Sequence, residues 1–412
     1  MSKEYVEKLF QRYKMQRIDK ELSIAEKYAD LIVNKHEELR NLLCTTETNA
    51  TAEDEIYRSI NYLYSFLHKQ KAYVSSEKSQ VVCCYLPLNQ PLYSFVLNVL
   101  TASFVCRKVY YRPPQKLWRL HQSLYELLVQ DQSAIQIVMV SRNKFFKEYV
   151  DSADIVIYTG RYENVQELCS NVNKKALLIY NGSALNPVIV TKNADLNVCC
   201  EEVVNARLYN TGQDCMAPAA VLVHDDIAVR FMRNLKDRLD AVRLGENSWD
   251  PAIIGSMISK DSFNENIRYI LLNASSIVYG GHWNENNFLI SPTIFFNKRY
   301  SGENQQIFYA PFFCIYQYAC LQEIHMYFST KEAECYKGYV SVFGTDSDVE
   351  SLNLCEQGLI VLQNKTLFRY EDGNTEFGGY GEGCSFVMHN GKKEIHPILL
   401  LREISEWRNK QW

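Results

Sequence analysis

The chain has 412 residues, 47% of them hydrophobic and 22% charged, with a formal net charge of −4. This length exceeds the size of a single hydrophobic core, so we expect two domains in an ordinary globular protein. The small net charge gives no electrostatic basis for binding nucleic acid or an anionic membrane. The sequence begins without the apolar segment of a signal peptide and has no apolar run of roughly 18 residues, so we expect a cytoplasmic protein.

Residues 1–72 are rich in Glu, Lys, Leu and Tyr and contain neither Pro nor Gly. Apolar residues recur at helical spacing, for example Ile24, Tyr28, Leu31 and Ile32. The pattern predicts several helices, which we expect to pack on the domain that follows.

From about residue 80, short apolar runs alternate with helical segments. Strands are predicted over residues 81–86, 105–111, 134–140, 154–159 and 176–180, and helices over 92–104 and 116–129. This alternation is typical of a mainly parallel sheet whose strands are joined by helical crossovers.

A second α/β region begins near residue 187. Its predicted strands cover residues 187–190, 219–223, 292–296 and 312–318, with a helix over 226–239. The tail contains a glycine-dense loop at 377–383 and an apolar run at 397–401, Pro397-Ile-Leu-Leu-Leu401. We predict that this run is a strand that docks on a neighbouring subunit.

Thirteen cysteines are present, without a CxxC pair and without a cysteine–histidine cluster at zinc-binding spacing. The odd count and the strand-like surroundings predict free, buried, small hydrophobic side chains in a reducing compartment. We therefore predict no metal site. Cys215 is the exception, because it lies in a turn-forming frame, Asn210-Thr-Gly-Gln-Asp-Cys215-Met-Ala-Pro218, directly before an apolar run. Gly and Asn allow the tight backbone that presents a reactive side chain, and a thiol presented in this way suits covalent catalysis at a carbonyl.

Four further segments stand in a recognisable order around this cysteine. They are Leu86-Pro-Leu-Asn89-Gln-Pro91, Val109-Tyr-Tyr-Arg112-Pro-Pro114, Ile157-Tyr-Thr159-Gly160 and Asn186-Pro187. Together with the cysteine motif they resemble the aldehyde dehydrogenase superfamily over about residues 80–401. The resemblance implies an α/β fold with a Rossmann-type cofactor domain, an α/β catalytic domain and a C-terminal strand used for oligomerisation.

The resemblance also implies roles for single residues. Cys215 matches the nucleophile, and Asn89 matches the asparagine whose amide helps to form the oxyanion hole. The cofactor-binding positions that it implies in this part of the chain are Leu86, Pro87, Arg112, Thr159, Gly160 and Arg161. Arg112 stands where the superfamily commonly has a lysine, and its guanidinium also suits a 2′-phosphate, so the cofactor is NAD or NADP. Arg161 replaces a small polar residue, and an arginine there either clamps a phosphate or obstructs it.

Each of these residues also fits a purely structural role. Asn89 between two prolines suits a turn, Arg112 suits a solvated strand end, Gly160 suits an ordinary strand-to-helix turn, and Cys215 suits an inert core.

Two positions depart from the superfamily pattern. Asn181 stands where hydrolytic members carry a glutamate, six residues before Pro187. An amide cannot take a proton from water, and general-base assistance contributes about 10²–10⁴ in rate, so hydrolysis of an acyl-enzyme is expected to be slow. The segment Gln306-Ile-Phe308-Tyr-Ala-Pro311 corresponds to a Glu-x-Phe-Gly-Pro segment that contacts the cofactor, with one extra residue. Gln306 and Phe308 are therefore the implied cofactor contacts there.

We expect a helical segment over residues 1–72, a cofactor domain over 73–186, a catalytic domain over 187–375 and a closing tail over 376–412. The predicted function is NAD(P)-dependent interconversion of an aldehyde and an acyl thioester of coenzyme A or a carrier protein, in a homodimer or larger homo-oligomer. Two alternatives stay open: a hydrolytic enzyme with a displaced base, for example Glu376 or Glu382, and a non-catalytic protein that binds partners.

Overall fold

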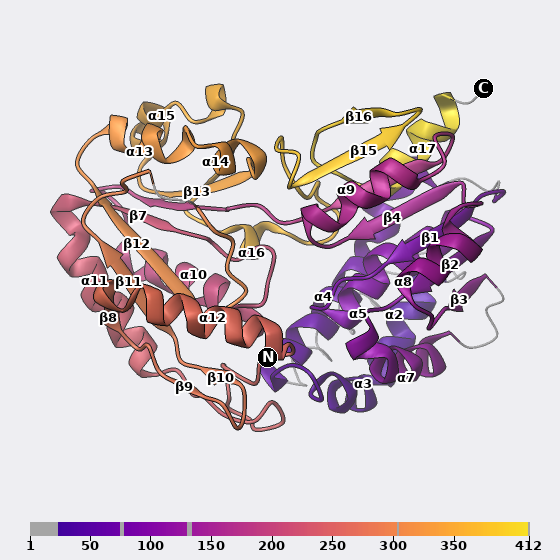
Figure 1. The fold of residues 1–412 in the computed structure, drawn as a ribbon, viewed down its shortest axis with the longest axis horizontal. Coiled ribbons are helices and arrows are strands. Elements are labelled where there is room, and N and C mark those ends of the chain that lie inside the picture. Colours follow the sequence, from indigo (N-terminus) through magenta and orange to yellow (C-terminus); the bar gives the residue numbers. More distant parts are fainter. Residues whose placement is uncertain (1–23, 75–77, 130–133, 303–304, 411–412) are drawn as a thin grey trace.

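The computed structural model describes residues 24–74, 78–129, 134–302 and 305–410. Two seven-stranded sheets organise the chain into two lobes, with the short helix α16 (Leu367–Tyr370) between them (Figure 1). Among the described residues, no helix is long and apolar enough to cross a membrane.

The N-terminal helices belong to the first lobe. They are α2 (Ile24–Asn34), α3 (His36–Leu43) and α4 (Asn49–Gln70), followed by the 3₁₀ turn η1 (Lys71–Tyr73). The side chain of Thr48 caps α4 by accepting a hydrogen bond from the backbone N–H of Thr51. Tyr28 and Ile32 are buried in the core of this lobe, in agreement with the predicted helical spacing. The predicted helix content of residues 1–23 lies outside the described residues.

The first sheet has the strand order β16-β15-β5-β4-β1-β2-β3. Its parallel strands are β1 (Val81–Tyr85), β2 (Lys108–Arg112), β3 (Ile135–Ile137), β4 (Ile155–Thr159) and β5 (Leu177–Asn181). This confirms the predicted parallel sheet. The predicted strand 105–111 begins too early, because Val105 ends a helix, and the predicted strand 134–140 shortens to three residues.

Helices join these strands. They are α5 (Pro91–Ser94), the π-helical η2 (Phe95–Leu100), α6 (Thr101–Val105), η3 (Gln115–Leu117), α7 (Trp118–Leu128), α8 (Arg142–Phe145), the π-helical η4 (Phe146–Val150) and α9 (Tyr162–Asn171). The predicted helix 92–104 is therefore confirmed with a π-helical middle, a feature that is often found near functional sites.

The second sheet has the order β14-β13-β6-β7-β12-β11-β8. Its strands are β6 (Val188–Val190), β7 (Val221–His224), β8 (Ile277–Tyr279), β11 (Thr293–Asn297), β12 (Phe312–Tyr318), β13 (Tyr339–Phe343) and β14 (Ile360–Gln363), and β9 (Trp283–Asn284) pairs with β10 (Leu289–Ile290). The helical segments are α10 (Leu196–Leu208), η5 (Tyr209–Gly212), α11 (Asp225–Asp240), α12 (Lys260–Leu272), η6 (Ala274–Ser276), α13 (Leu321–Phe328), α14 (Lys331–Cys335), α15 (Asp346–Leu352) and η7 (Cys355–Gln357).

The tail returns to the first lobe. Strand β15 (Ser385–His389) pairs antiparallel with β5, and β16 (Lys392–Glu394) pairs with β15. The predicted strand at 397–401 is wrong: Ile398 forms only an isolated bridge with Phe377, and helix α17 (Leu400–Lys410) begins within the run. Leu401, Ile404 and Trp407 recur at helical spacing and are buried against the chain's own core, so this segment is no free oligomerisation strand. Homo-oligomer formation stays a prediction.

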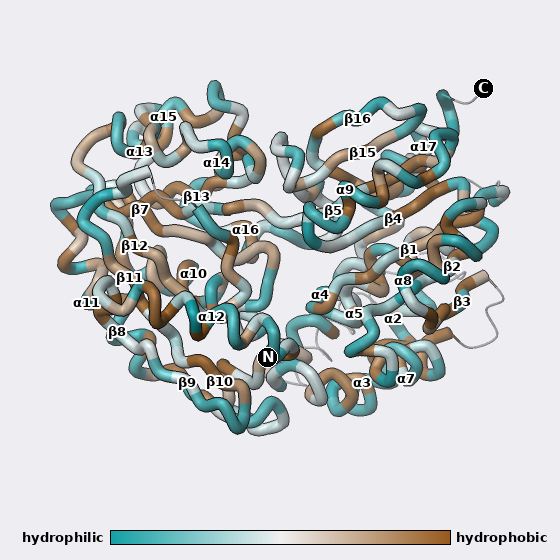
Figure 2. The backbone as a smooth tube through the Cα atoms, in the orientation of Figure 1, coloured by the Kyte–Doolittle hydropathy of each residue, from teal (hydrophilic) through white to brown (hydrophobic). Residues whose placement is uncertain are grey.

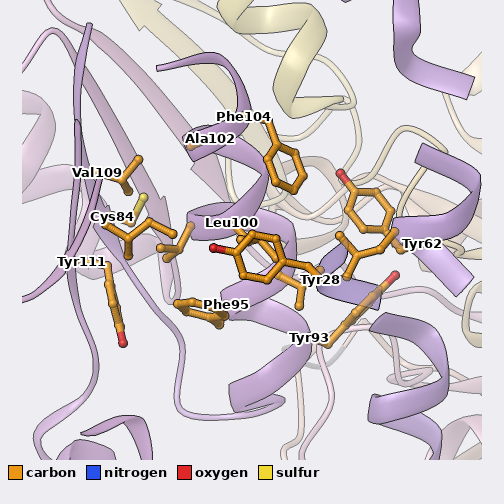
Figure 3. Packing of buried hydrophobic residues seen from close by; sticks show 14 of the residues in the cluster. Tyr28, Tyr62, Cys84, Tyr93, Phe95, Leu100, Ala102, Phe104, Val109 and Tyr111 are labelled. Carbon is orange, nitrogen blue, oxygen red and sulfur yellow. The ribbon is translucent and has the colours of Figure 1, made fainter. Parts of the chain in front are cut away.

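Apolar residues gather in the strands and on the inner faces of the helices (Figure 2). In the first lobe, aromatic rings from the helices lie beside the strand residues Cys84, Val109 and Tyr111 (Figure 3). All thirteen cysteines are free. Seven are buried as predicted, whereas Cys320 and Cys355 are exposed, because they lie at the starts of surface helical turns.

Candidate active site

A cavity of about 380 Å³ lies where the two lobes and the tail meet. The first lobe contributes the loop after β1 and the loop after β4, and the second contributes the Cys215 loop. The C-terminal part of the chain contributes Glu371, Gly373, Thr375, Phe377 and residues 398–400. In the order β3-β2-β1-β4-β5, the chain runs from β1 outward to β2 and β3 and then crosses to β4 and β5 on the other side of β1. The loops after β1 and β4 therefore flank the switch point. Ligands of open α/β sheets bind in the crevice at this point, outside the carboxyl ends of the strands.

The backbone before Cys215 is strained. Asn210, Thr211 and Gly212 have φ values of 48°, 59° and 76°, three left-handed residues in succession. A threonine is rarely left-handed, and Thr211 is held there because its hydroxyl accepts a hydrogen bond from the Gly255 N–H at 2.9 Å. A Cβ at position 212 would lie 2.4 Å from the Ala310 carbonyl, so only glycine fits. Strain of this kind clusters at active sites.

A buried arginine holds this loop in place. The Arg207 side chain is 1% exposed and donates hydrogen bonds to three backbone carbonyls: Pro218 at 3.1 Å, Gly212 at 2.6 Å and Phe308 at 2.9 Å. Burial lowers its pKa to about 10, so it stays protonated at neutral pH. Arg207 therefore ties both ends of the Cys215 loop to the segment that follows residue 305.

Cys215 is half-buried in the cavity wall, and its carbonyl accepts a hydrogen bond from the Asn186 side chain at 3.1 Å. Burial and the neighbouring Asp214 carboxyl raise the pKa of the Cys215 thiol well above its ordinary value. Asp214 is itself 1% exposed, and burial raises its pKa to about 6. The protein by itself thus favours the protonated thiol, and activation requires a positive charge or a proton acceptor near the sulfur.

The structure brings most of the predicted site residues together. Those that line the cavity with Cys215 are Asn89, Asn181, Leu86, Pro87, Thr159, Gly160 and Arg161. Asn181 ends β5, and its carbonyl accepts a hydrogen bond from the Gly160 N–H at 3.0 Å. Asn181, the residue at the position of the superfamily glutamate, therefore lines the same cavity as Cys215.

Three predicted cofactor contacts do not line this cavity. Arg112 lies at the end of β2 and donates from Nε to the Val140 carbonyl at 2.9 Å. Gln306 lines a second cavity of about 300 Å³, and Phe308 is buried in an aromatic cluster with its ring 4.6 Å from that of Tyr269. Phe308 contributes to the site through its carbonyl, which Arg207 binds.

The two cavities share part of their walls. Ser183 and Tyr309 line both, and their hydroxyls are 2.6 Å apart. Tyr309 is the first of two residues, Tyr309 and Ala310, where the superfamily segment has a single glycine. Arg161 also lines both cavities and lies over the Tyr309 ring at 6.0 Å. The extra residue thus places a phenol between the Cys215 cavity and Gln306.

The sequence offered Glu376 and Glu382 as displaced bases, and both bind partners outside the Cys215 cavity. Glu376 pairs with Arg402, and Glu382 binds the Tyr162 hydroxyl and the Lys393 amine. Neither lines the cavity. Among the described residues, no group of three or more His, Cys, Asp and Glu side chains could hold a metal ion.

Sequence reasoning missed Arg207, Asp214, Tyr309 and Glu371. Asp214 and Tyr309 lie inside motifs that the sequence analysis had recognised, directly before Cys215 and in the segment with the extra residue, and these positions are the signal that could have identified them. Arg207 and Glu371 carry no local signal, because their partners are backbone groups and side chains far along the chain.

Comparison with known proteins places the chain in a family. The model of the aldehyde dehydrogenase family matches residues 6–383, so the chain belongs to this family. A 2,5-dioxopentanoate dehydrogenase from Saccharolobus solfataricus is 24% identical over 303 residues, 66% of this chain and 63% of that protein. A betaine aldehyde dehydrogenase from Bacillus subtilis is 30% identical over 156 residues, 35% of this chain and 31% of that protein. The chain thus matches less than two thirds of the length of these curated relatives.

Solved structures agree on the fold. A glyceraldehyde-3-phosphate dehydrogenase from Methanocaldococcus jannaschii, complexed with NADP, superposes with a TM-score of 0.76 at 20% identity and covers 97% of this chain and 94% of its own. A succinic semialdehyde dehydrogenase from Streptococcus pyogenes, in complex with NADP⁺, gives a TM-score of 0.79 at 16% identity and covers 96% and 94%.

Proposed function

We propose that the protein is an NAD(P)-dependent oxidoreductase that interconverts an aldehyde and an acyl thioester through a covalent intermediate on Cys215. The observation that carries this proposal is the composition of the main cavity. Cys215 and Asn89 line it together at the switch point of the first sheet, and residue 181 in the same wall is an amide.

Cys215 and Asn89 have different roles in the covalent step. The Cys215 sulfur attacks the aldehyde carbonyl carbon, and the negative charge that develops on the carbonyl oxygen is stabilised by the Asn89 amide and the Cys215 N–H. Such donors are each worth about 10²–10³ in rate. Loss of hydride from the adduct leaves a thioester on Cys215, and an acceptor thiol then attacks the thioester and releases the cysteine.

Asn181 favours a thiol as the acceptor. An amide cannot take a proton from water, whereas a few per cent of an ordinary thiol is already thiolate near neutrality. Coenzyme A and a carrier-protein thiol share this chemistry.

The residues around the first sheet fit a dinucleotide, which supplies the hydride acceptor or donor when it is bound. The Thr159 hydroxyl is buried in the cavity wall and has no hydrogen-bond partner among the described residues, so a bound ligand would satisfy it. The first turn of α9 follows Gly160 and Arg161, and a helix N-terminus of this kind binds phosphate. Leu86, Pro87 and Gln306 would complete the contacts.

Two guanidinium groups at the adjoining strand ends favour NADP. Arg142, after β3, lies close enough to Arg112 that its charge lowers the Arg112 pKa, after the larger effect of burial. A 2′-phosphate would relieve this repulsion.

We expect Arg112→Gln and Arg142→Gln each to weaken NADPH binding about 10-fold or more, the worth of one charge-assisted hydrogen bond, with little effect on NADH. Fluorescence titration measures both, and Lys108→Gln, at the other end of β2, is the matched control. An equal loss for NADH and NADPH would contradict this role.

Acceptor dependence tests the proposed function. We expect aldehyde and NAD(P) to give a stable acyl adduct on Cys215, seen as added intact mass and located by peptide mapping. Coenzyme A should then discharge the adduct faster than buffer, because its thiol is partly thiolate near neutrality and needs no base, whereas residue 181 offers none to water. Release of free acid without a thiol at the rate of discharge by coenzyme A contradicts a thiol as the preferred acceptor. If no adduct forms and neither NADH nor NADPH changes the thermal stability, the chain is a non-catalytic partner-binding protein.

A further inference from the structure

One acidic side chain lines the Cys215 cavity. Of the described residues in its wall, Glu371 alone carries a carboxyl group. It directly follows α16, between the lobes (Figure 1), and is 8% exposed. Its charge is near enough to Cys215 to disfavour the thiolate. The loop that holds it passes close to two tyrosines, because a Cβ at Gly373 would lie 2.6 Å from Tyr62 and 2.8 Å from the Tyr93 hydroxyl.

Hydrogen bonds orient this carboxylate but do not saturate it. The Tyr93 hydroxyl donates to both oxygens, at 3.0 and 3.2 Å. The Gly373 N–H donates to Oε1 at 2.6 Å, and Arg58 Nη1 donates to Oε2 at 3.4 Å. The Tyr93 hydroxyl has a single proton to share between the two oxygens, so three protons face the roughly four lone-pair sites of the carboxylate, and a water molecule in the cavity can donate to the remaining site.

The other buried carboxyl groups nearby lack this access. Asp214, Glu47 and Glu55 are at most 2% exposed and do not line the cavity. Burial raises the pKa of both Glu47 and Glu55, and Glu55 accepts a hydrogen bond from the Tyr93 N–H at 2.8 Å. Among the described residues, Glu371 is thus the carboxyl group that lines the same cavity as Cys215.

We propose that Glu371 is the general base for hydrolysis of the acyl group on Cys215, the task that the amide of Asn181 cannot perform. The proposal rests on the acyl-enzyme of the proposed function. The Glu371 carboxylate takes a proton from water while the water oxygen bonds to the acyl carbon. The carbon–sulfur bond then breaks, the Cys215 thiolate leaves, and the acid departs. Transfer to a thiol bypasses Glu371, because the thiolate needs no base.

The environment of Glu371 gives this step a pH dependence. Burial raises the Glu371 pKa above its ordinary value, while Arg58, the Tyr93 hydroxyl and the Gly373 N–H oppose this. The other titratable groups near it are Tyr62, Tyr339, Asp372 and Cys215. The base is active when deprotonated, so hydrolysis rises with pH through the Glu371 pKa and then levels off.

A cofactor-free assay isolates the step. 4-Nitrophenyl acetate acylates a reactive thiol and releases nitrophenolate in a burst, and the later steady rate reports deacylation. We expect Glu371→Gln to keep the burst and to slow the thiol-free steady rate about 10²-fold, within the range of general-base assistance. Discharge by added coenzyme A should change less than about threefold, as expected when no base assists the thiol. Glu376→Gln is the matched control, because its carboxylate pairs with Arg402 outside the cavity and its rates should be unchanged.

Tyr93→Phe separates a base from a structural role. Loss of the phenol raises the Glu371 pKa, because this hydrogen bond lowers it. The acid limb of the deacylation profile should therefore move to higher pH, a change that a merely structural carboxylate would not cause. An unchanged acid limb in Tyr93→Phe overturns the proposal. Equal thiol-free deacylation rates in the wild type and Glu371→Gln also overturn it, as does a Glu371→Gln variant in which hydrolysis and discharge by coenzyme A slow equally. If Glu371→Gln does not fold, the Tyr93→Phe profile decides. Absence of any acyl adduct on Cys215 in the wild type, both from 4-nitrophenyl acetate and from aldehyde with NAD(P), instead contradicts acylation of Cys215, and with it the proposed function.

Discussion

Replacement of Cys215 by alanine is expected to abolish acyl-adduct formation and turnover with every aldehyde and acyl thioester. The thiol supplies the only bond that holds the substrate through both halves of the proposed reaction, so its loss removes the intermediate itself. The cavity wall has no other described cysteine, because the remaining twelve lie outside it. Intact-mass analysis after incubation with aldehyde and NAD(P) measures this directly.

The control must account for other reactive thiols. Cys320 and Cys355 are exposed, so Cys320→Ala and Cys355→Ala should keep full turnover and full adduct at Cys215. NAD(P)H binding and thermal stability of Cys215→Ala should stay close to the wild type, because a half-buried thiol removed from a cavity wall leaves little new void. Turnover that persists in Cys215→Ala would rule out the cysteine as nucleophile.

The second large effect is expected at Arg207. Arg207→Met removes the donors from three buried carbonyls, and each unsatisfied buried acceptor costs about 1–3 kcal/mol. Relief of the buried charge offsets part of this loss, so we expect the free energy of unfolding to fall by about 2–5 kcal/mol. Denaturant titration measures the change. The burst with 4-nitrophenyl acetate should also shrink, because the left-handed run before Cys215 loses its anchor.

An exposed arginine provides the comparison. Arg233 lies on α11 with its side chain in solvent, and Arg233→Met should change stability by no more than about 0.5 kcal/mol. If Arg207→Met is equally harmless, the three hydrogen bonds do not hold the loop. Arg207→Lys should recover only part of the stability, because an ammonium group lacks the planar fork that reaches separated carbonyls.

Hydrophobic patterning predicted the central strands of both sheets. The run at 312–318 is β12 without change, and 154–159 is β4 within one residue. Such strands are buried on both faces, so an unbroken apolar run marks them clearly. The pattern failed at 397–401, where a short apolar run opens an amphipathic helix. A strand and the start of a helix are told apart here only by the burial of Ile404 and Trp407, which lie beyond the run.

The candidate site was predictable where it depends on short motifs. Cys215, Asn89, Asn181 and Gly160 were found because turn chemistry and motif spacing are local properties. Arg58 and Glu371 were not, since α4 and the loop after α16 are more than 300 residues apart in the chain and meet only in the folded protein.

The sequence alone determined the family resemblance, the nucleophile candidate and the loss of the usual base at Asn181. Each of these inferences depends on a few residues that are neighbours in the sequence. The tertiary structure decided which carboxylate lines the cavity of Cys215: it pairs Glu376 and Glu382 with partners outside the cavity and places Glu371 in its wall. The physical reason is that a carboxylate's role depends on its burial, its hydrogen-bond donors and its access to the cavity, and all three are set by contacts between distant segments.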